Sequence, residues 1–270
     1  MSSPLNKALY SLLFDKAYRE AFLSDRLRDS SLSQGDLAAL QSIDRAELTS
    51  ASETICARIL NGDFDLGGGL RKVYPGVFRA LGEMNLSERE VGYRLLASPE
   101  FRRYKELPFN GEGLCIEEAF YLFLRRQRSF REASESNVLL LTHEFLGAIL
   151  AILTVNEHPY FVIASKLIRF NGFIRYATYR YPDAIVRALV DIPPAVPAGD
   201  TVGFLYASSI HRRFIKGAVD DLTLACIRLG SWQAIRRRAR SLGRDFGADV
   251  GLLANVAEKL VDLGLIAGTA

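Results

Sequence analysis

Apolar residues recur three or four positions apart along the first part of the chain, from Leu5 to about residue 132. This spacing is typical of amphipathic α-helices that bury one face. Helix starts are marked by a Ser or Asp followed three residues later by an acidic residue, as in Ser33–Asp36, Asp44–Glu47 and Ser87–Glu90. The pattern predicts that residues 1–132 form an almost entirely helical bundle.

A polar and charged segment, Gln127–Asn137, separates this region from a long apolar run, Val138–Val155. We place a domain boundary in the polar segment, which divides the chain into residues 1–132 and 133–270. The apolar run is about as long as the shortest helix that crosses a bilayer. His143 and Glu144 stand side by side near its start, however, and both are costly in hydrocarbon. We therefore expect a buried core helix.

The pattern is less regular after this helix. Aromatic and arginine residues are mixed between Tyr160 and Tyr181, and we expect a helix that ends at Pro182. Thr201–Phe214 then has the character of an extended hairpin.

The chain closes with three predicted helices. The first spans Asp221–Leu229, the second is opened by Gly230–Trp232 and stops near Phe246, and the third spans Val250–Leu263. Strands followed by three short helices outline a winged helix, a module that binds DNA through a helix or a peptide along a strand edge. The predicted fold is mainly α with a small β component: an N-terminal helical bundle followed by a winged-helix-like α+β domain.

Composition narrows the class of protein only slightly. Of the 270 residues, 49% are hydrophobic and 24% are charged, as is usual for a soluble globular protein. The net charge of +3 is too small to indicate nucleic-acid binding by itself. Cys56, Cys115 and Cys226 lie far apart, without a partner at metal-ligand spacing. Because the N-terminus has no apolar signal segment, we expect a reducing, cytoplasmic location.

No catalytic constellation stands out in the sequence. His143 and Glu144 are neighbours, but adjacent helical residues point about 100° apart and do not form one site. A zinc-binding helix would need a second His at position 147, which is Gly147. We therefore predict no catalytic residues and no metal ligands on this chain.

An arginine run marks the second of the three C-terminal helices. At helical spacing it covers a broad face, while Ile235, Ala239 and Leu242 point to the core. Three interpretations stay open: a solvated face, a surface for an anionic protein or peptide, and a surface for the phosphates of DNA. The run consists of Arg236, Arg237, Arg238, Arg240 and Arg244.

The hairpin tip, Ile210–Lys216, alternates apolar and basic residues. An exposed strand edge there would take up an extended peptide by strand addition, in which backbone hydrogen bonds provide affinity and side chains set the register. The alternative is a plain wing whose edge is covered by other parts of the protein.

Three segments carry a resemblance to a known family: Leu9–Leu23, Val73–Leu81, and Asp220–Leu229 leading to Glu258–Ile266. Their order resembles the partner subunits of multinuclear non-haem iron-dependent oxidases, which modify ribosomally made peptides. Those subunits have an N-terminal helical bundle and a C-terminal domain similar to a peptide recognition element. The length and the N-terminal segment are most similar to the TglI-like subunits of 3-thiaglutamate biosynthesis, and the MbnC-like subunits are shorter relatives.

The resemblance implies that this chain is an accessory subunit in a heterodimer and that iron is held by the oxidase. The helical bundle would dock the oxidase, and the second domain would hold a precursor peptide whose C-terminal cysteine loses its β-carbon at the iron site. Tethering the precursor would raise the local concentration of its reactive end. The residues expected to contact the peptide are Val202, Phe204, Tyr206, Ile210, Arg212, Arg213, Phe214 and Lys216.

Other functions remain as alternatives. A winged-helix transcriptional regulator would bind DNA with an affinity that falls steeply with salt. A stand-alone enzyme would show turnover or bound metal in the purified chain. A helical scaffold would bind a partner protein but no peptide.

Overall fold

The computed structural model describes residues 3–62, 69–106, 115–155, 164–171, 174–182 and 201–268. The chain divides into two compact units, of which the first contains the described residues up to Asn137 and the second those from Val138 onward. The protein is mainly helical, with one small antiparallel sheet in the second unit. The mainly α fold with a small β component is therefore confirmed.

The first unit is built from short helices whose starts are set locally. Ser33 and Asp36 form a reciprocal capping box, because the Ser33 hydroxyl accepts from the Asp36 N–H at 3.1 Å and the Asp36 carboxylate accepts from the Ser33 N–H at 3.0 Å. Asp44 and Ser87 cap the helices that follow them, as predicted. The helices are α1 (Pro4–Phe14), α2 (Lys16–Leu23), α3 (Gln34–Gln41), α4 (Arg45–Asn61), α5 (Leu70–Val73), α6 (Pro75–Glu83), α7 (Glu88–Leu96), α8 (Pro99–Glu106), α9 (Ile116–Arg126) and α10 (Arg128–Ala133).

Two apolar clusters hold these helices together. One joins α1 to α4 through Leu12, Phe22 and Leu48. The other is aromatic: the ring of Phe120 stacks on Phe78 at 5.5 Å between centroids and lies 5.0 Å from the ring of Tyr74. Aromatic pairs at these separations add to the free energy that burial of their surface provides.

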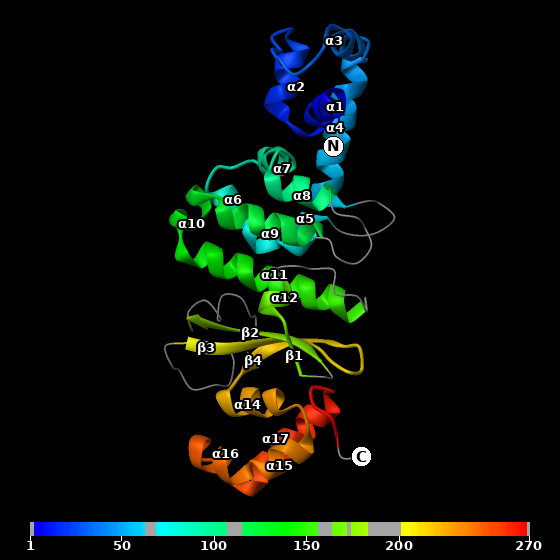
Figure 1. Ribbon diagram of the computed structural model, residues 1–270. Coiled ribbons are helices and arrows are strands. Elements are labelled where there is room, and N and C mark those ends of the chain that lie inside the picture. Colours follow the sequence, from blue (N-terminus) through cyan, green and yellow to red (C-terminus); the bar gives the residue numbers. More distant parts are fainter. Residues whose placement is uncertain are drawn as a thin grey trace. The chain divides into compact units, whose positions relative to one another are not determined.

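The second unit has three layers, as Figure 1 shows. Its sheet is a meander with the strand order β1-β2-β3-β4, all neighbours antiparallel. Helix α11 lies on one face of the sheet, and the C-terminal helices α14 to α17 cover the other face. The elements are α11 (Glu135–Val155), α12 (Ala164–Leu167), β1 (Arg169–Phe170), β2 (Arg175–Pro182), β3 (Thr201–Ser208), β4 (Phe214–Val219), α14 (Asp221–Leu229), α15 (Trp232–Arg237), α16 (Ala239–Phe246) and α17 (Val250–Asp262).

The side chains of β3 point alternately to the two faces of the sheet. Leu205 and Ala207 belong to the cluster that the sheet forms with the C-terminal helices. Phe204 and Tyr206 point the other way and lie against His143 of α11. Because both faces are covered, almost every residue of β3 is buried.

Helix α11 matches the apolar run Val138–Val155. Within the described residues it is the helix that is long and apolar enough to cross a membrane, and half of its most apolar stretch is buried inside the protein.

The prediction of a helix between Tyr160 and Tyr181 is wrong. The described part of this segment contains the single turn α12 and the strands β1 and β2, while residues 156–163 and 172–173 lie outside the described structure. The reason is a period of two along β2: Tyr176 joins the cluster under the C-terminal helices, whereas Tyr181 faces α11. Both faces of β2 carry a buried tyrosine, while Tyr179 and Arg180 are exposed, so the segment shows no simple alternation of apolar and polar residues in the sequence.

The first and third C-terminal helices are confirmed. A hairpin is present as predicted, but its second strand, Phe214–Val219, begins where the expected segment ended. The second helix is divided. Its two halves, α15 and α16, meet at Arg238, whose N–H is shared between the carbonyls of Ala234 and Ile235 at 3.2 and 3.1 Å. Shared hydrogen bonds of this kind are common at helix ends. Arg236, Arg237 and Arg238 at this division are all exposed.

Candidate peptide-binding edge

The residues expected to contact a peptide fall into two groups. Val202, Phe204 and Tyr206 lie in β3 and are buried. Ile210, Arg212 and Arg213 lie in the exposed turn between β3 and β4, and the remaining two, Phe214 and Lys216, lie on β4 itself. The structure therefore brings the second group together at the hairpin tip and outer strand, and places the first group in the core.

Strand β3 has no free edge, because it is paired on both sides. It pairs with β2 along its whole length, from Thr201 opposite Pro182 to Ser208 opposite Arg175, and with β4 on its other side. Its backbone N–H and C=O groups are used by these two ladders. Val202, Phe204 and Tyr206 therefore lie on a strand that has no free edge for an added strand.

Strand β4 is the last strand of the sheet, and no strand of the described structure pairs with its outer edge. The Ser209 N–H donates to the Arg213 carbonyl at 2.9 Å, which marks these residues as a hydrogen-bonded pair. Such pairs alternate along an antiparallel ladder. The even-numbered residues of β4 therefore direct their backbone N–H and C=O outward: Phe214, Lys216 and Ala218.

The side chains along this edge differ between the two faces of the sheet. Lys216 stands opposite Tyr206 in the register, so it lies on the face covered by α11, and it is exposed. Ile215 and Val219 lie on the other face and pack at the margin of the cluster under the C-terminal helices. A strand added here would meet a cation on one face and apolar side chains on the other.

The turn that leads into β4 is well ordered by its own hydrogen bonds. The Arg212 N–H donates to the Ser209 carbonyl at 3.0 Å, and the Arg213 N–H donates to the Ser209 hydroxyl at 3.2 Å. The Ile210 N–H donates to the carbonyl of Gly264 at 3.0 Å, which fastens the turn to the end of α17. The exposed arginines are thus presented on a fixed backbone.

A buried polar chain lies between α11 and the sheet. Nδ1 of His143 is 2.6 Å from the Tyr206 hydroxyl, which is 2.9 Å from the Tyr181 hydroxyl. Burial lowers the pKa of His143 from 6.5 to about 4, and the positive charge of Lys216 adds to this effect. Burial, with the neighbouring Tyr181, raises the pKa of Tyr206 well above its usual range. A neutral His143 that accepts a hydrogen bond from Tyr206 fits both shifts.

His143 and Tyr181 were not expected to act together. The sequence offered His143 only as a neighbour of Glu144. Its actual partners come from β2 and β3, at least thirty-eight positions further along the chain. A strand assignment for β2 would have placed Tyr181 on a buried face, but the segment was expected to be a helix.

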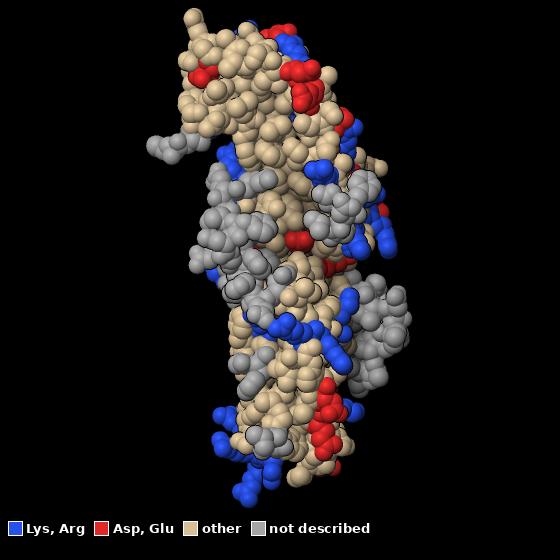
Figure 2. Space-filling view, turned by 90° about the vertical axis from the view of Figure 1, so that its right-hand side faces the viewer, with Lys and Arg blue, Asp and Glu red and all other residues tan. Residues whose placement is uncertain are grey.

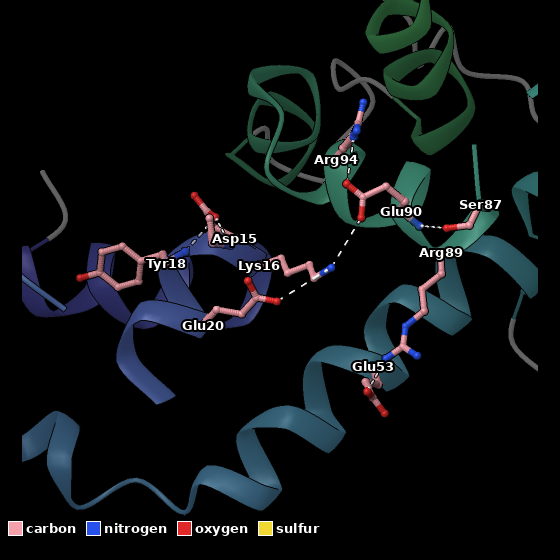
Figure 3. Close-up of polar contacts among 10 residues, drawn as sticks. Asp15, Lys16, Tyr18, Glu20, Glu53, Ser87, Arg89, Glu90 and Arg94 are labelled. Atoms are coloured by element: carbon pink, nitrogen blue, oxygen red, sulfur yellow. Dashed lines mark hydrogen bonds and ion pairs between the residues drawn. The ribbon is translucent and has the colours of Figure 1, made fainter. Parts of the chain in front are cut away.

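The first unit holds a surface network of charges, shown in Figure 3. Lys16 of α2 lies 3.6 Å from the carboxylate of Glu90 on α7, which also pairs with Arg94 at 3.0 Å. Arg89 of α7 pairs with Glu53 of α4. These side chains are largely exposed, and exposed pairs contribute little to stability. The network links three helices of the first unit.

Burial raises the pKa of the cysteine thiols in the described residues. Cys56 and Cys226 are buried, and burial raises the pKa of both, in Cys226 to about 11. A protonated thiol is a poor nucleophile and metal ligand. In the part of the chain that the structure describes, no three His, Cys, Asp or Glu side chains are grouped to hold a metal ion.

Comparisons with protein-family models, with curated proteins and with solved structures give no match to this chain.

Proposed function

We propose that this chain is a non-catalytic, cytoplasmic accessory subunit that binds a ribosomally made precursor peptide. It would present the C-terminal cysteine of that peptide to a partner iron-dependent oxidase, in a 3-thiaglutamate-type pathway that removes the cysteine β-carbon. The choice of this family rests on the sequence resemblance alone. The structural observation that carries the proposal is the outer edge of β4, with outward backbone groups and basic residues at its start.

In this proposal the peptide adds a strand to β4, within a winged-helix-like recognition domain formed by the sheet and α14 to α17. Side chains of an added strand alternate between the faces of the sheet. Those beside Lys216 would be acidic, and those beside Ile215 and Val219 would be apolar. Arg212 and Arg213 would pair with acidic residues at the end of the peptide strand that lies near the turn.

The first unit would dock the oxidase. An apolar groove of about 240 Å³ lies between α1 and α4, and Leu9 at its side is partly exposed. Exposed apolar surface on a folded protein commonly marks a protein interface. The groove is lined by Leu9, Leu12, Leu13, Ile43, Asp44, Glu47, Leu48 and Ala51.

The first experiment is recovery of the tagged chain from its native host at moderate salt, followed by mass spectrometry and iron analysis. An iron-bearing oxidase together with a short peptide that ends in cysteine would support the accessory-subunit proposal. DNA in the eluate, or the chain alone with iron bound, would contradict it.

The strand edge is tested with the peptide so identified, by fluorescence anisotropy. Ala218→Pro removes one outward N–H without breaking the ladder with β3, so it should weaken binding by about two- to tenfold, the effect of one lost hydrogen bond. Lys216→Glu should also weaken binding, whereas Arg103→Glu, an equal charge change on the first unit, should not. Unchanged affinity in both β4 variants would refute the edge as the peptide site.

A DNA-binding regulator is the second candidate, because the exposed arginines of α15 and α16 follow the sheet in the order of a winged helix. It predicts binding to duplex DNA with a steep salt dependence and a sequence-specific footprint. The same purified chain, tested against duplex DNA and against the recovered peptide, separates the two candidates.

A further inference from the structure

The C-terminal helices carry a surface that the strand edge does not use. We call it the arginine face, made of Arg236, Arg237, Arg238, Arg240 and Arg244, all of them exposed. Arg244 pairs with Asp245 at 3.3 Å. Within the described structure the other arginines of the face have no acidic side chain within ion-pair distance.

The backbone beneath the arginine face is held firmly at both ends. Ile235 and Leu242 are buried in the core of the second unit. The start of α15 is fastened to the C-terminal segment, since the Trp232 N–H donates to the Ala267 carbonyl at 3.0 Å and the Ala267 N–H donates to the Gly230 carbonyl at 2.9 Å. The backbone that carries the arginines is therefore fixed, so binding does not have to order it.

Charge is segregated on this part of the protein. Basic and acidic residues are nearly balanced between Val219 and Gly268, yet the stretch from Trp232 to Arg244 contains no acid. In the lower part of Figure 2, where the C-terminal helices lie, basic side chains gather together and acidic side chains form a separate group. A local positive patch on an almost neutral surface favours a partner whose own carboxylates contact the arginines at short range.

Apolar side chains border the arginine face where α16 turns into α17. Phe246 is 42% exposed, Val250 77% and Leu252 48%, close together in sequence on either side of Gly247. Exposed aromatic and aliphatic side chains beside arginines are the composition of protein interfaces. The phosphate backbone of DNA has no apolar groups that would cover these side chains.

We propose that the arginine face and the corner formed by Phe246, Val250 and Leu252 are a docking surface for an acidic polypeptide segment that carries apolar side chains. The carboxylates pair with the guanidinium groups, which suit bidentate contacts, and the apolar side chains cover the corner. This surface is separate from the β4 edge and does not depend on the function proposed for that edge.

The test uses the full-length chain and a fluorescein-labelled peptide of about twelve residues, made of Glu and Asp with one Leu and one Phe, in about 0.1 M salt, where charges within about 10 Å still interact. The variant Arg236→Gln/Arg240→Gln/Arg244→Gln removes three cations of the face. Its matched control, Arg26→Gln/Arg28→Gln/Arg103→Gln, removes three exposed cations of the first unit.

The face variant should weaken peptide binding at least about tenfold and the control less than about twofold, because rim charges act mainly at short range in salt. Phe246→Ser should weaken binding severalfold while leaving the salt dependence unchanged. Equal losses in the face variant and the control would overturn the proposal, since binding would then follow net charge alone. Tighter binding of a duplex DNA that depends on the same arginines would also overturn it and assign the face to nucleic acid.

Discussion

His143 should make the stability of the second unit depend on pH, because tertiary contacts bury its side chain. The residue is only 7% exposed, its Nδ1 lies 2.6 Å from the Tyr206 hydroxyl, and the rings of Tyr181 and Phe204 lie against its imidazole. Protonation would place a charge in this apolar site and turn Nδ1 from an acceptor into a donor. The replacement His143→Asn keeps an oxygen acceptor near the position of Nδ1 but cannot be protonated.

The magnitude follows from the pKa of His143, which burial lowers from 6.5 to about 4. Since the folded pKa lies below the unfolded one, the unfolded chain binds more protons between these values. The contribution of His143 to the free energy of unfolding is therefore highest above pH 6.5 and falls as the pH decreases toward 4. At 1.36 kcal/mol for each pKa unit, the full loss is about 3 kcal/mol.

The assay is urea unfolding followed by the fluorescence of Trp232, the single tryptophan of the chain, which packs against the core of the second unit. Other groups titrate in the same range, so the difference between the wild type and His143→Asn isolates the histidine. We expect the wild type to lose about 3 kcal/mol more than the variant between pH 7 and pH 4. Parallel curves for the two proteins would refute a neutral, desolvated His143.

Three further predictions concern stability and are measured by the same denaturation or by circular dichroism. Gly264→Ala should destabilise the second unit by about 1–3 kcal/mol, because Gly264 has φ of 68° and a Cβ there would come 2.6 Å from the His211 ring; no change would mean that this turn relaxes freely. Gly92→Ala should cost about 1–3 kcal/mol in the first unit, since the new Cβ would come 2.7 Å from Sγ of Cys56, and Gly82→Ala, where nothing lies within 4 Å, is its control. Ser33→Ala should cost about 1 kcal/mol by removing the cap of α3, and a neutral result would show that Asp36 alone suffices.

Local signals in the sequence determined much of the helical structure. Ser33, Asp44 and Ser87 each cap the helix predicted to follow, because a capping hydrogen bond spans only three residues. The ends of α14 and α16 fall at Gly230 and Gly247, both in the left-handed conformation that favours glycine. The hairpin of β3 and β4 was likewise visible, since its two strands are joined by a short turn.

The order of the strands was decided only by the tertiary structure. The partner of β3 on its far side is β2, whose residues the sequence assigned to a helix and whose pairing depends on contacts between distant segments. This pairing turns Val202, Phe204 and Tyr206 into core residues and moves the open edge to Phe214, Lys216 and Ala218. The period of β2 is hidden because one face meets α11 and the other meets the C-terminal helices. Exposed Tyr179 and Arg180 also interrupt the buried positions of the strand, so only the packing of the two layers reveals its period.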